Sequence, residues 1–272
     1  MKKILVIPKN LNNLGNILKT EINGIILPIK DLSVGYSTYF TIEDIKDIIN
    51  LTSKEICVII NKTLHKDDLP LLEQVLVKLN KLNISKIIFT DLGVLNLSEK
   101  LNISKELVIY QEHLNVSISS NNFYQKRNIQ YTLISNDITK EEINEISKSN
   151  KLMLTCYGYI PIFYSRRKLI SNYLEYIKEK KEEVMYYIKA KDDRYPIIEE
   201  NDGTTIFTKE PINLINEIEN IDVDYIILNA FNINEELFMN TLNNYLENKK
   251  EKKETYTGFI NKRTVYNIKD YE

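Results

Sequence analysis

The sequence predicts an α/β fold, a (β/α)8 TIM-barrel-like single domain. Eight short runs rich in β-branched residues recur along the chain, and each is typical of a strand. The runs are apolar throughout and alternate with helical patterns, which indicates a parallel sheet covered on its outer face. Eight such units favour a closed barrel, with an open doubly wound sheet as the alternative. The expected strands are residues 3–8, 24–28, 55–61, 85–91, 106–111, 129–135, 151–156 and 223–231.

The helices between these strands are marked by apolar periodicity and by cap residues. The clearest is residues 69–82, where leucine and valine recur along one stripe. Thr41 precedes a first turn that carries Asp44, and Thr139 is followed three residues later by Glu142. Both starts resemble capping boxes, in which the threonine and the acidic side chain satisfy unpaired backbone N–H groups. We therefore expect helices to begin at both threonines.

One region interrupts the alternation of strands and helices. Residues 194–210 have strand-like flanks around the Asn-Asp-Gly sequence at 201–203, a turn signal for a hairpin rather than a crossover. We interpret this segment as a β-hairpin inserted into a barrel domain that spans residues 1–248. The lysine-rich stretch after the last helix and the alternating residues 258–272 predict a short C-terminal β tail over residues 249–272.

Composition limits the classes of partner. The chain of 272 residues has a formal net charge of −2 and a pI near 5.9. This balance argues against a protein that holds nucleic acid through its overall charge, so we expect no DNA partner and only local RNA contacts. No stretch approaches the ~20 apolar residues of a membrane span, and the N-terminus lacks a signal-peptide cleavage site. We therefore expect a cytoplasmic protein with no membrane partner, in which Cys57 and Cys156 are buried thiols.

In a barrel, the functional residues should lie where the strands end, at the C-terminal edge. Polar residues stand at or just after most of these ends, and we expect six residues from this edge to open onto one common cavity. These six are Lys62, Asp91, Asn115, Asp137, Gly158 and Asn229. His65 and His113 also follow strands and are candidates for acid–base groups, because imidazole titrates near neutrality. The alternative is that each histidine is an ordinary loop residue.

Residues 157–176 place three consecutive cations ahead of an apparent amphipathic helix. Arg166, Arg167 and Lys168 lie where a helix N-terminus offers backbone donors and the positive end of its dipole, an arrangement that attracts phosphate or carboxylate. Four aromatic residues beside them are candidates for stacking a base of a flexible RNA loop. These four are Tyr157, Tyr159, Phe163 and Tyr164. The alternatives are a solvated loop for the cations and barrel packing for the aromatic rings.

The stretch YGYIPIFYSRRKLISNYL resembles the signature of the peptidase U32 family, the collagenase-like peptidases. In that signature a glycine is followed by a Tyr-Ser-Gly-Arg-Cys-Leu-x-Ser block and often by Asn-Tyr. Segments 131–146, 192–215 and 256–272 are similar to the family's strand-six, hairpin and tail segments, so the resemblance covers most of the chain. The matching signature residues are Gly158, Tyr164, Ser165, Arg167, Leu169, Ser171, Asn172 and Tyr173.

The resemblance implies a (β/α)8-type core and a choice of activities. Some family members are described as peptidases. Others are implicated in oxygen-independent hydroxylation of RNA bases or of quinone precursors, and some of these carry an iron–sulfur cluster. The family's cluster ligands fall here at Pro161 and Lys168, and two cysteines in one chain cannot build a four-cysteine cluster. We therefore expect no iron–sulfur cofactor and no metal site.

Other family positions are also changed in this chain. The usual Glu and His upstream of the glycine are replaced by Met153 and Tyr157, and the strand-six Arg-Glu pair is replaced by Asn136-Asp137. These replacements fall on acid–base groups of the family signature, so catalytic residues are not assigned from the resemblance.

Two functional hypotheses from different classes follow. In the first, which we favour, the chain takes part in tRNA hydroxylation at a wobble uridine, either as the enzyme or as the cluster-free partner of a longer family member. In the second it is a collagenase-like peptidase, and a non-catalytic binding protein is a further alternative. No sequence feature ties either histidine to a particular Ser or Cys, which does not favour proteolysis. The candidate substrate- or RNA-binding residues are Asn115, Tyr157, Gly158, Tyr164, Ser165, Arg166, Arg167, Lys168 and Asn172.

Overall fold

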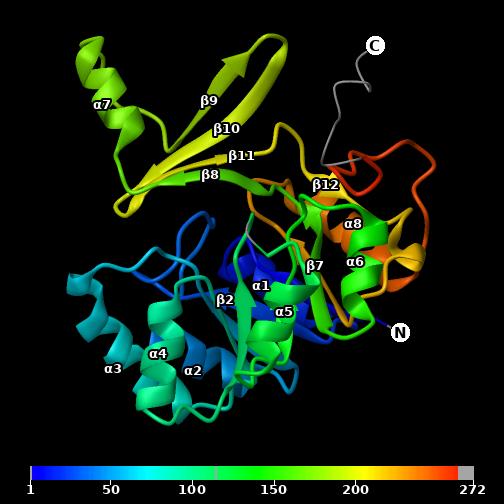
Figure 1. Ribbon diagram of the computed structural model, residues 1–272. Coiled ribbons are helices and arrows are strands. Elements are labelled where there is room, and N and C mark those ends of the chain that lie inside the picture. Colours follow the sequence, from blue (N-terminus) through cyan, green and yellow to red (C-terminus); the bar gives the residue numbers. More distant parts are fainter. Residues whose placement is uncertain (1, 114, 263–272) are drawn as a thin grey trace.

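A computed structural model describes residues 2–113 and 115–262 of the chain. Its centre is a closed barrel of parallel strands with helices around the outside (Figure 1). Neighbouring strands follow the chain order from β1 to β7, and β13 lies between β7 and β1. The strands are β1 (Lys3–Ile7), β2 (Gly24–Pro28), β3 (Glu55–Ile60), β4 (Lys86–Phe89), β5 (Glu106–Tyr110), β6 (Tyr131–Leu133), β7 (Lys151–Gly158) and β13 (Tyr225–Asn229). The predicted (β/α)8 barrel is confirmed.

Two parallel pairings close the barrel and exclude the open doubly wound alternative. β6 pairs with β7, where Tyr131 lies opposite Lys151. β13 pairs with β1 along its whole length, from Tyr225 opposite Lys3 to Asn229 opposite Ile7. Because the strands of this closed barrel are parallel, their C-terminal ends all lie at the same mouth.

The helices begin where caps and periodicity indicated. Thr41 forms a capping box with Asp44 before α2 (Ile42–Leu51), and Thr139 forms one with Glu142 before α6 (Lys140–Ser147). The apolar stripe expected over 69–82 is the buried face of α3 (Leu69–Asn80), which follows the short helix η1 (Lys66–Asp68). The other barrel helices are α1 (Leu11–Leu18), α4 (Leu92–Lys100), α5 (Ile118–Gln125) and α8 (Glu235–Leu246), and η2 (Ile218–Asn220) precedes β13.

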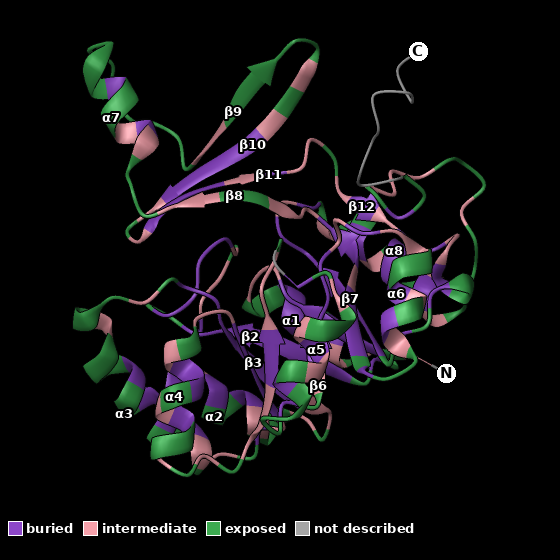
Figure 2. Cartoon of the chain, in the orientation of Figure 1, coloured by how far each residue is buried: buried purple, intermediate pink, exposed green. Residues whose placement is uncertain are grey.

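Apolar side chains fill both faces of the barrel wall. Leu5, Ile59 and Ile227 belong to the inner core, whereas Val6 and Val58 pack in the layer between the wall and the helices. Each strand therefore buries both of its faces (Figure 2), which explains why its sequence is apolar throughout.

A buried ion-pair cluster closes the N-terminal end of the barrel. The Lys86 ammonium lies 2.6 Å from the Glu55 carboxylate, 2.9 Å from that of Glu106, and 5.1 Å from the ring centroids of Tyr131 and Tyr225. Burial alone would lower the pKa of Lys86, but the hydrogen bonds to both carboxylates raise it. Functional groups of a (β/α)8 barrel are therefore expected at the opposite, C-terminal end.

A four-stranded antiparallel sheet lies across that C-terminal end (Figure 1). Its strand order is β8-β11-β10-β9, and we call these strands the inserted sheet. They are β8 (Pro161–Ser165), β9 (Met185–Ala190), β10 (Asp193–Glu200) and β11 (Gly203–Phe207), and α7 (Leu169–Tyr176) follows β8. The hairpin expected over 194–210 is present as β10 and β11. The insertion is larger than expected, because β8 and β9 add a strand at each edge.

The two faces of the inserted sheet have different coverings. On the outer face, Ile197 packs with Ile170 and Leu174 of α7. On the face toward the barrel, Phe207 stacks on Phe231, which follows β13, with ring centroids 4.4 Å apart. Much of β9 and α7 is exposed, in contrast to the barrel strands (Figure 2).

The described part of the expected C-terminal β tail packs on the barrel as turns and coil. The backbone N–H of Asn213, in β12 (Ile212–Asn213), donates to the oxygen of Tyr256 at 2.8 Å, and that of Lys140 donates to Ile260 at 3.0 Å. Residues 258–261 form a turn, and residues 263–272 of the predicted strand lie outside the described residues.

The helices found within residues 2–113 and 115–262 include none with the length and apolar character that a membrane span requires.

Candidate functional site

All six positions expected at one edge do lie at or just after the C-terminal ends of barrel strands, but they do not share one cavity. The cavity inside this end of the barrel is lined by Asn229 alone among the six. The other five are Lys62, Asp91, Asn115, Asp137 and Gly158, and each makes contacts within the protein. The expectation of a common cavity is therefore not met.

Lys62, directly after β3, joins the barrel to the inserted sheet. Its ammonium lies 2.9 Å from the Asp68 carboxylate of the barrel and 2.6 Å from that of Asp202, at the tip of the β10–β11 hairpin. Burial alone would lower the pKa of Lys62, but the hydrogen bonds to Asp202 and Asp68 raise it. Because Lys62 is only 4% exposed, its charge depends on these two carboxylates.

Asp91 and Asn115 stabilise loops. The Asp91 carboxylate caps α4 by accepting from the backbone N–H of Gly93 at 2.7 Å, and it also accepts from that of Leu64 at 3.0 Å. Asn115 is fully buried, and its side chain exchanges hydrogen bonds with that of Asn121. In this conformation the Asn115 amide, a candidate for substrate binding, is turned into the protein.

His113 and Asp137 form a pair at the rim of the barrel. Nδ1 of His113 hydrogen-bonds to the Asp137 carboxylate, and this bond raises the pKa of the imidazole. The neighbouring Glu112 is half-buried, and burial, with the charge of Asp137, raises its pKa to about 7. Glu112 and His113 therefore place two titratable side chains side by side at the rim. His65 is exposed, and its backbone exchanges hydrogen bonds with Asp68: its N–H donates to the Asp68 carboxylate and its oxygen accepts from the Asp68 N–H.

Two tyrosines narrow the barrel mouth just inside this rim. Tyr36, from the loop between β2 and α2, and Tyr110, at the end of β5, line a cavity of about 20 Å³ with Asn229 and apolar strand residues. Burial raises the pKa of both phenols, and the nearby Glu112 raises it further. A cavity of this size holds roughly one water molecule. The mouth is therefore closed to larger ligands in this conformation.

Gly158 lets the end of β7 pass close to the end of β13. Its φ is 129°, and a Cβ at this position would lie 2.7 Å from the backbone oxygen of Asn229. A larger residue would push the two strands apart and would be strained at this φ. Gly158 is therefore part of the wall of the mouth through its backbone.

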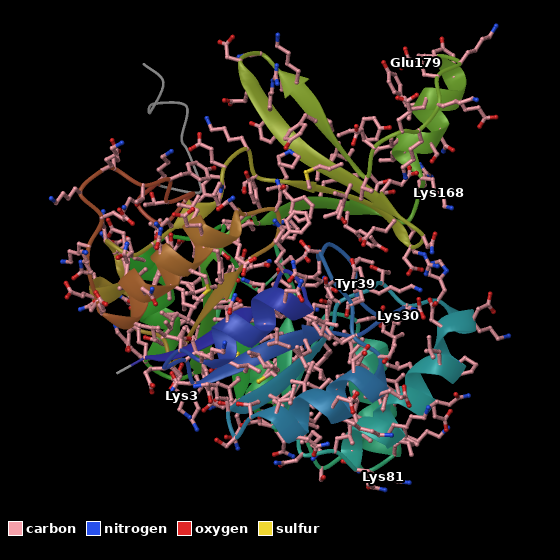
Figure 3. The ribbon with its side chains drawn as sticks, turned by 180° about the vertical axis from the view of Figure 1, so that it is seen from behind. Lys3, Lys30, Tyr39, Lys81, Lys168 and Glu179 are labelled. Atoms are coloured by element: carbon pink, nitrogen blue, oxygen red, sulfur yellow. The ribbon has the colours of Figure 1, made fainter. Side chains whose placement is uncertain are left out.

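A polar cleft of about 410 Å³ lies beside the mouth, between the β2–α2 loop and the tip of the inserted sheet. Across it, the Tyr39 hydroxyl hydrogen-bonds to the Glu200 carboxylate, which also accepts from the backbone N–H of Gly35 at 2.9 Å. Figure 3 shows Lys30 and Tyr39 on the barrel side of this cleft, below the inserted sheet. No pattern in the sequence predicted the four residues Tyr36, Tyr39, Glu112 and Glu200. The one available signal was the Gly-Tyr-Ser-Thr-Tyr loop at 35–39 that follows the second strand.

The aromatic residues expected to stack a base are mostly packed. Tyr157 is 4% exposed and lies against Phe238 of α8, with ring centroids 5.9 Å apart. Tyr159 packs edge-on against Phe231, and the Tyr164 hydroxyl donates to the backbone oxygen of Asp202 at 2.7 Å. Barrel packing therefore accounts for Tyr157 and Tyr159. The ring of Phe163, on the outer face of the inserted sheet, remains 43% exposed.

The three consecutive cations point in different directions. Arg166 reaches the barrel, where it donates to the backbone oxygen of Thr63 at 3.1 Å and lies 3.2 Å from the Asp68 carboxylate. Arg167 and Lys168 are exposed, and in the described residues no ion pair engages either side chain (Figure 3 labels Lys168). The Ser165 hydroxyl accepts from the backbone N–H of Arg167 at 3.2 Å, and the candidate Asn172 is exposed on α7.

The anion at the start of α7 is the Glu199 carboxylate of β10. It accepts from the backbone N–H of Ser171 at 2.9 Å and from the Ser171 hydroxyl, and it pairs with Lys181 at 3.1 Å. Burial alone would raise the pKa of Glu199, but the bonds from Ser171 lower it. The Thr204 hydroxyl accepts from a further first-turn donor, the N–H of Leu169. A ligand anion would therefore meet the side chains of Arg167 and Lys168 rather than the helix donors.

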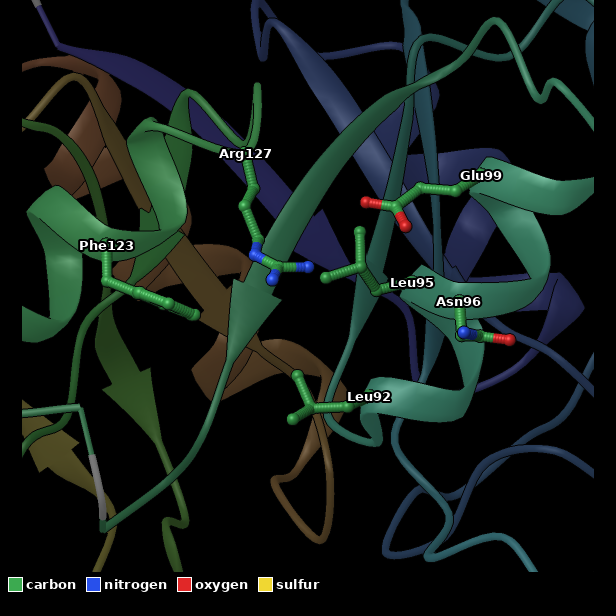
Figure 4. A pocket seen from close by; sticks show the side chains of 6 residues that line it. All are labelled: Leu92, Leu95, Asn96, Glu99, Phe123 and Arg127. Carbon is green, nitrogen blue, oxygen red and sulfur yellow. The ribbon is translucent and has the colours of Figure 1, made fainter.

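Another groove lies in the helical layer, outside the barrel mouth. Figure 4 shows Phe123 and Arg127 on one side of it and Leu92 and Leu95 of α4 on the other. Its volume is about 270 Å³, and the Arg127 guanidinium lies 5.2 Å from the centroid of the Phe123 ring. This groove is mainly apolar and carries no acid–base pair like that of the rim.

The chain is similar to known proteins over most of its length. The model of peptidase family U32 matches residues 9–262, almost the whole chain. The chain belongs to peptidase family U32. A protein of Bacillus subtilis (strain 168) named tRNA hydroxylation protein P2 is 23% identical over 236 residues, which cover 81% of this chain and 76% of that protein. No solved structure matches the chain.

The cysteines of this U32 chain do not fit an iron–sulfur cluster. Cys57 lies in the inner core of the barrel and Cys156 in the layer between wall and helices, so the two thiols are on opposite faces of the wall. Burial raises the pKa of Cys57 to about 12 and also raises that of Cys156, whereas cluster ligands are thiolates. Pro161 and Lys168, the positions where the signature resemblance implies ligands, supply no sulfur. Across residues 2–113 and 115–262, no group of three His, Cys, Asp or Glu side chains converges as a metal site.

The replaced family positions have structural roles in this U32 chain. Met153 belongs to the inner core of the barrel, and the Asn136 amide donates to the backbone oxygen of Thr155 at 2.8 Å. Asp137 keeps a carboxylate at the rim, where it meets His113. The rim therefore retains ionisable groups, in an arrangement different from the family signature.

Proposed function

We propose that this U32 chain takes part in tRNA hydroxylation as a cluster-free subunit that acts beside a longer family member. The observation that carries the proposal is the similarity, over most of both chains, to a protein named for tRNA hydroxylation. The placement of Cys57 and Cys156 on opposite faces of the barrel wall supports the cluster-free role, because cluster ligands must converge. In this role, the base that is hydroxylated is a wobble uridine of the tRNA.

The inserted sheet offers groups suited to a flexible RNA loop. Arg167 and Lys168 are exposed cations, and Phe163 presents an aromatic face on the same unit. Phosphates would contact the two cationic side chains, and an unstacked base would lie on the ring. Asn172 and Ser165 lie next to these groups along the chain and supply neutral hydrogen-bonding side chains.

A peptidase role has less support from the rim. Asp137 orients His113 as the third member of a catalytic triad would. In the described part of the chain, however, no Ser or Cys side chain hydrogen-bonds to His113, and both thiols are buried. A nucleophile adjacent to the base is the geometric requirement for that chemistry.

Mass spectrometry of tRNA nucleosides tests the proposal. A strain that lacks this chain should lose the hydroxylated wobble uridine, and deletion of the longer U32 member should give the same loss. The purified chain should be colourless and contain no stoichiometric iron when prepared without oxygen. Different nucleoside profiles for the two deletions would disprove the pairing. An iron–sulfur absorption band from the isolated chain would disprove the cluster-free role.

A further inference from the structure

The inserted sheet contacts the barrel in two places of opposite character. The first contact is apolar and lies where the chain enters and leaves the sheet. There Phe207, at the end of β11, stacks on Phe231, and Tyr159, just before β8, packs edge-on against the same ring. Because Phe207 and Phe231 are at most 3% exposed, this contact has the character of a small core.

The second contact is polar and lies at the other end of the sheet, around the β10–β11 tip. Asp202 meets Lys62 at 2.6 Å, and Arg166 meets Asp68 at 3.2 Å. Glu200 accepts from the backbone N–H of Gly35 and from the Tyr39 hydroxyl. We call these contacts the latch: Lys62–Asp202, Arg166–Asp68, and Glu200 with Gly35 and Tyr39.

The latch is the weaker of the two contacts. The Asp202 and Arg166 side chains are 25% and 34% exposed, so solvent screens their charges. The Lys62 side chain is 6% exposed, but it keeps its ion pair with Asp68 of the barrel when Asp202 separates. The polar cleft of about 410 Å³ runs between the tip and the β2–α2 loop, so the tip is not packed against the barrel as Phe207 is. Separation at the latch would therefore expose little apolar surface, whereas separation at Phe207 would expose a core.

The mouth beneath the sheet is too small for a ligand in the closed arrangement. Its cavity of about 20 Å³ is far below the ~300–1,000 Å³ of typical ligand sites. Tyr36 in its wall belongs to the same loop as Gly35 and Tyr39, which the latch holds. Release of the latch would therefore free the sheet tip and remove its hydrogen bonds to the loop that narrows the mouth.

We propose that the inserted sheet is a hinged lid on the barrel mouth, with the hinge at Phe207–Phe231 and the latch at the β10–β11 tip. Both connections between sheet and barrel, residues 159–160 and 208–211, lie at the hinge end, where a few backbone torsions can turn the sheet as a unit. Opening exposes Tyr36, Tyr110 and Asn229 to any ligand of the mouth, so the inference does not depend on the proposed role in tRNA hydroxylation.

Thiol labelling can measure the opening, because both natural cysteines are buried and have raised pKa values. Thr155→Cys places one thiol in the wall of the mouth, at a position that is partly buried in the closed arrangement. The reaction of this introduced thiol with a maleimide reports local opening. Cys57 and Cys156 report global unfolding in the same sample, since mass spectrometry resolves the modification at each cysteine.

The latch is weakened by Asp202→Asn in the Thr155→Cys chain. Labelling of the introduced thiol should become about tenfold faster, as expected when opening becomes easier by about 1.4 kcal/mol. The matched control is Asp193→Asn. This change removes an ion pair of similar length, Lys209–Asp193 at 3.0 Å, which joins β10 to the connection at the hinge end and does not touch the latch. Labelling in this control should match that of the chain with an intact latch.

Three results would overturn the lid. One is equal labelling of the introduced thiol with the latch intact and weakened. Another is an equal acceleration in the Asp193→Asn control, which would mean that the sheet is loosened generally. The third is a parallel rise in labelling of Cys57 and Cys156, which would show that the latch stabilises the whole fold rather than the closed position of the sheet.

Discussion

The barrel and the inserted sheet differ in what holds them in place. The barrel wall buries apolar side chains on both faces, and residues such as Leu5 and Val6 have no exposed surface. The inserted sheet buries short rows around Ile197 and Ile198, while Tyr187 of its edge strand β9 is 56% exposed. Apolar burial is not directional and tolerates many sequences, whereas the contacts of the sheet tip depend on individual charged groups.

This difference separates what determines the fold from what determines function. The barrel can stay closed when the charged groups at its mouth change, because its two cores are built from apolar and aromatic side chains. The position of the sheet over the mouth depends on a few residues, among them Lys62, Glu200 and Asp202. Changes in the barrel core should therefore affect global stability, and changes in the sheet should affect local order and binding.

The largest effect is expected in the barrel. Phe238→Ala removes a fully buried ring of α8 that packs against Tyr157, and it should lower the free energy of unfolding by about 3–5 kcal/mol. Urea denaturation followed by circular dichroism measures this change. Tyr176→Ala, at an 84% exposed ring of α7, is the control and should change stability by less than about 0.5 kcal/mol. Equal losses in both variants would contradict the division between the two regions.

A smaller and local effect is expected in the inserted sheet. Glu199→Ala leaves the first-turn donors of Ser171 and the Lys181 ammonium without their shared carboxylate, at a cost of about 2 kcal/mol. The loss should appear as faster hydrogen exchange in α7, with exchange in the barrel strands unchanged. Glu175→Ala, an exposed carboxylate on the same helix, is the matched control. Faster exchange throughout the barrel would mean that the sheet and barrel unfold as one unit.

At the rim the expected effect depends on pH. The pKa of Glu112 is raised by burial to about 7, so the folded chain binds a proton there that the unfolded chain loses near pH 4.5. Stability should therefore fall as pH rises from about 4.5 to 7 and stay at the lower value above that. Glu112→Gln should abolish this fall and be more stable than the parent at pH 8 by about 2 kcal/mol. An identical pH profile for both chains would show that Glu112 titrates normally.

The barrel could be predicted because its strands bury both faces and so carry an uninterrupted apolar signal. The inserted sheet was underestimated for the opposite reason. β8 lies within the basic, aromatic stretch, and β9 is an exposed edge strand, so neither shows a continuous apolar run. The hairpin of β10 and β11 was found because its turn has a specific sequence, Asn-Asp-Gly.

The mouth was only partly predictable. Lys62, Asp137 and Asn229 could be predicted to lie at the mouth, because the C-terminal ends of parallel strands lie at one edge of the barrel. No local pattern could show that Lys62 would pair with Asp202, or Tyr39 with Glu200, since these contacts join segments far apart in the chain. The cations illustrate the same limit. The sequence indicated an anion at the helix start, and the anion found there is Glu199, from a strand that follows the helix.

The smallest expected effect concerns RNA binding and compares the two regions directly. Arg167→Ala removes an exposed cation of the inserted sheet, and Arg127→Ala removes one from the groove on the barrel's helical layer. Each phosphate contact contributes about one to the slope of log affinity against log salt concentration, because bound cations release counterions from the RNA. If the inserted sheet holds the RNA, Arg167→Ala should lower that slope for tRNA by about one, and Arg127→Ala should leave it unchanged.

Fluorescence anisotropy with labelled tRNA across a salt series measures both slopes. Neither arginine side chain caps a helix or belongs to the latch, so a change in slope reports contact rather than stability. Equal slopes for the parent and both variants would assign Arg167 to a solvated loop, and an effect of Arg127 alone would place RNA on the barrel instead.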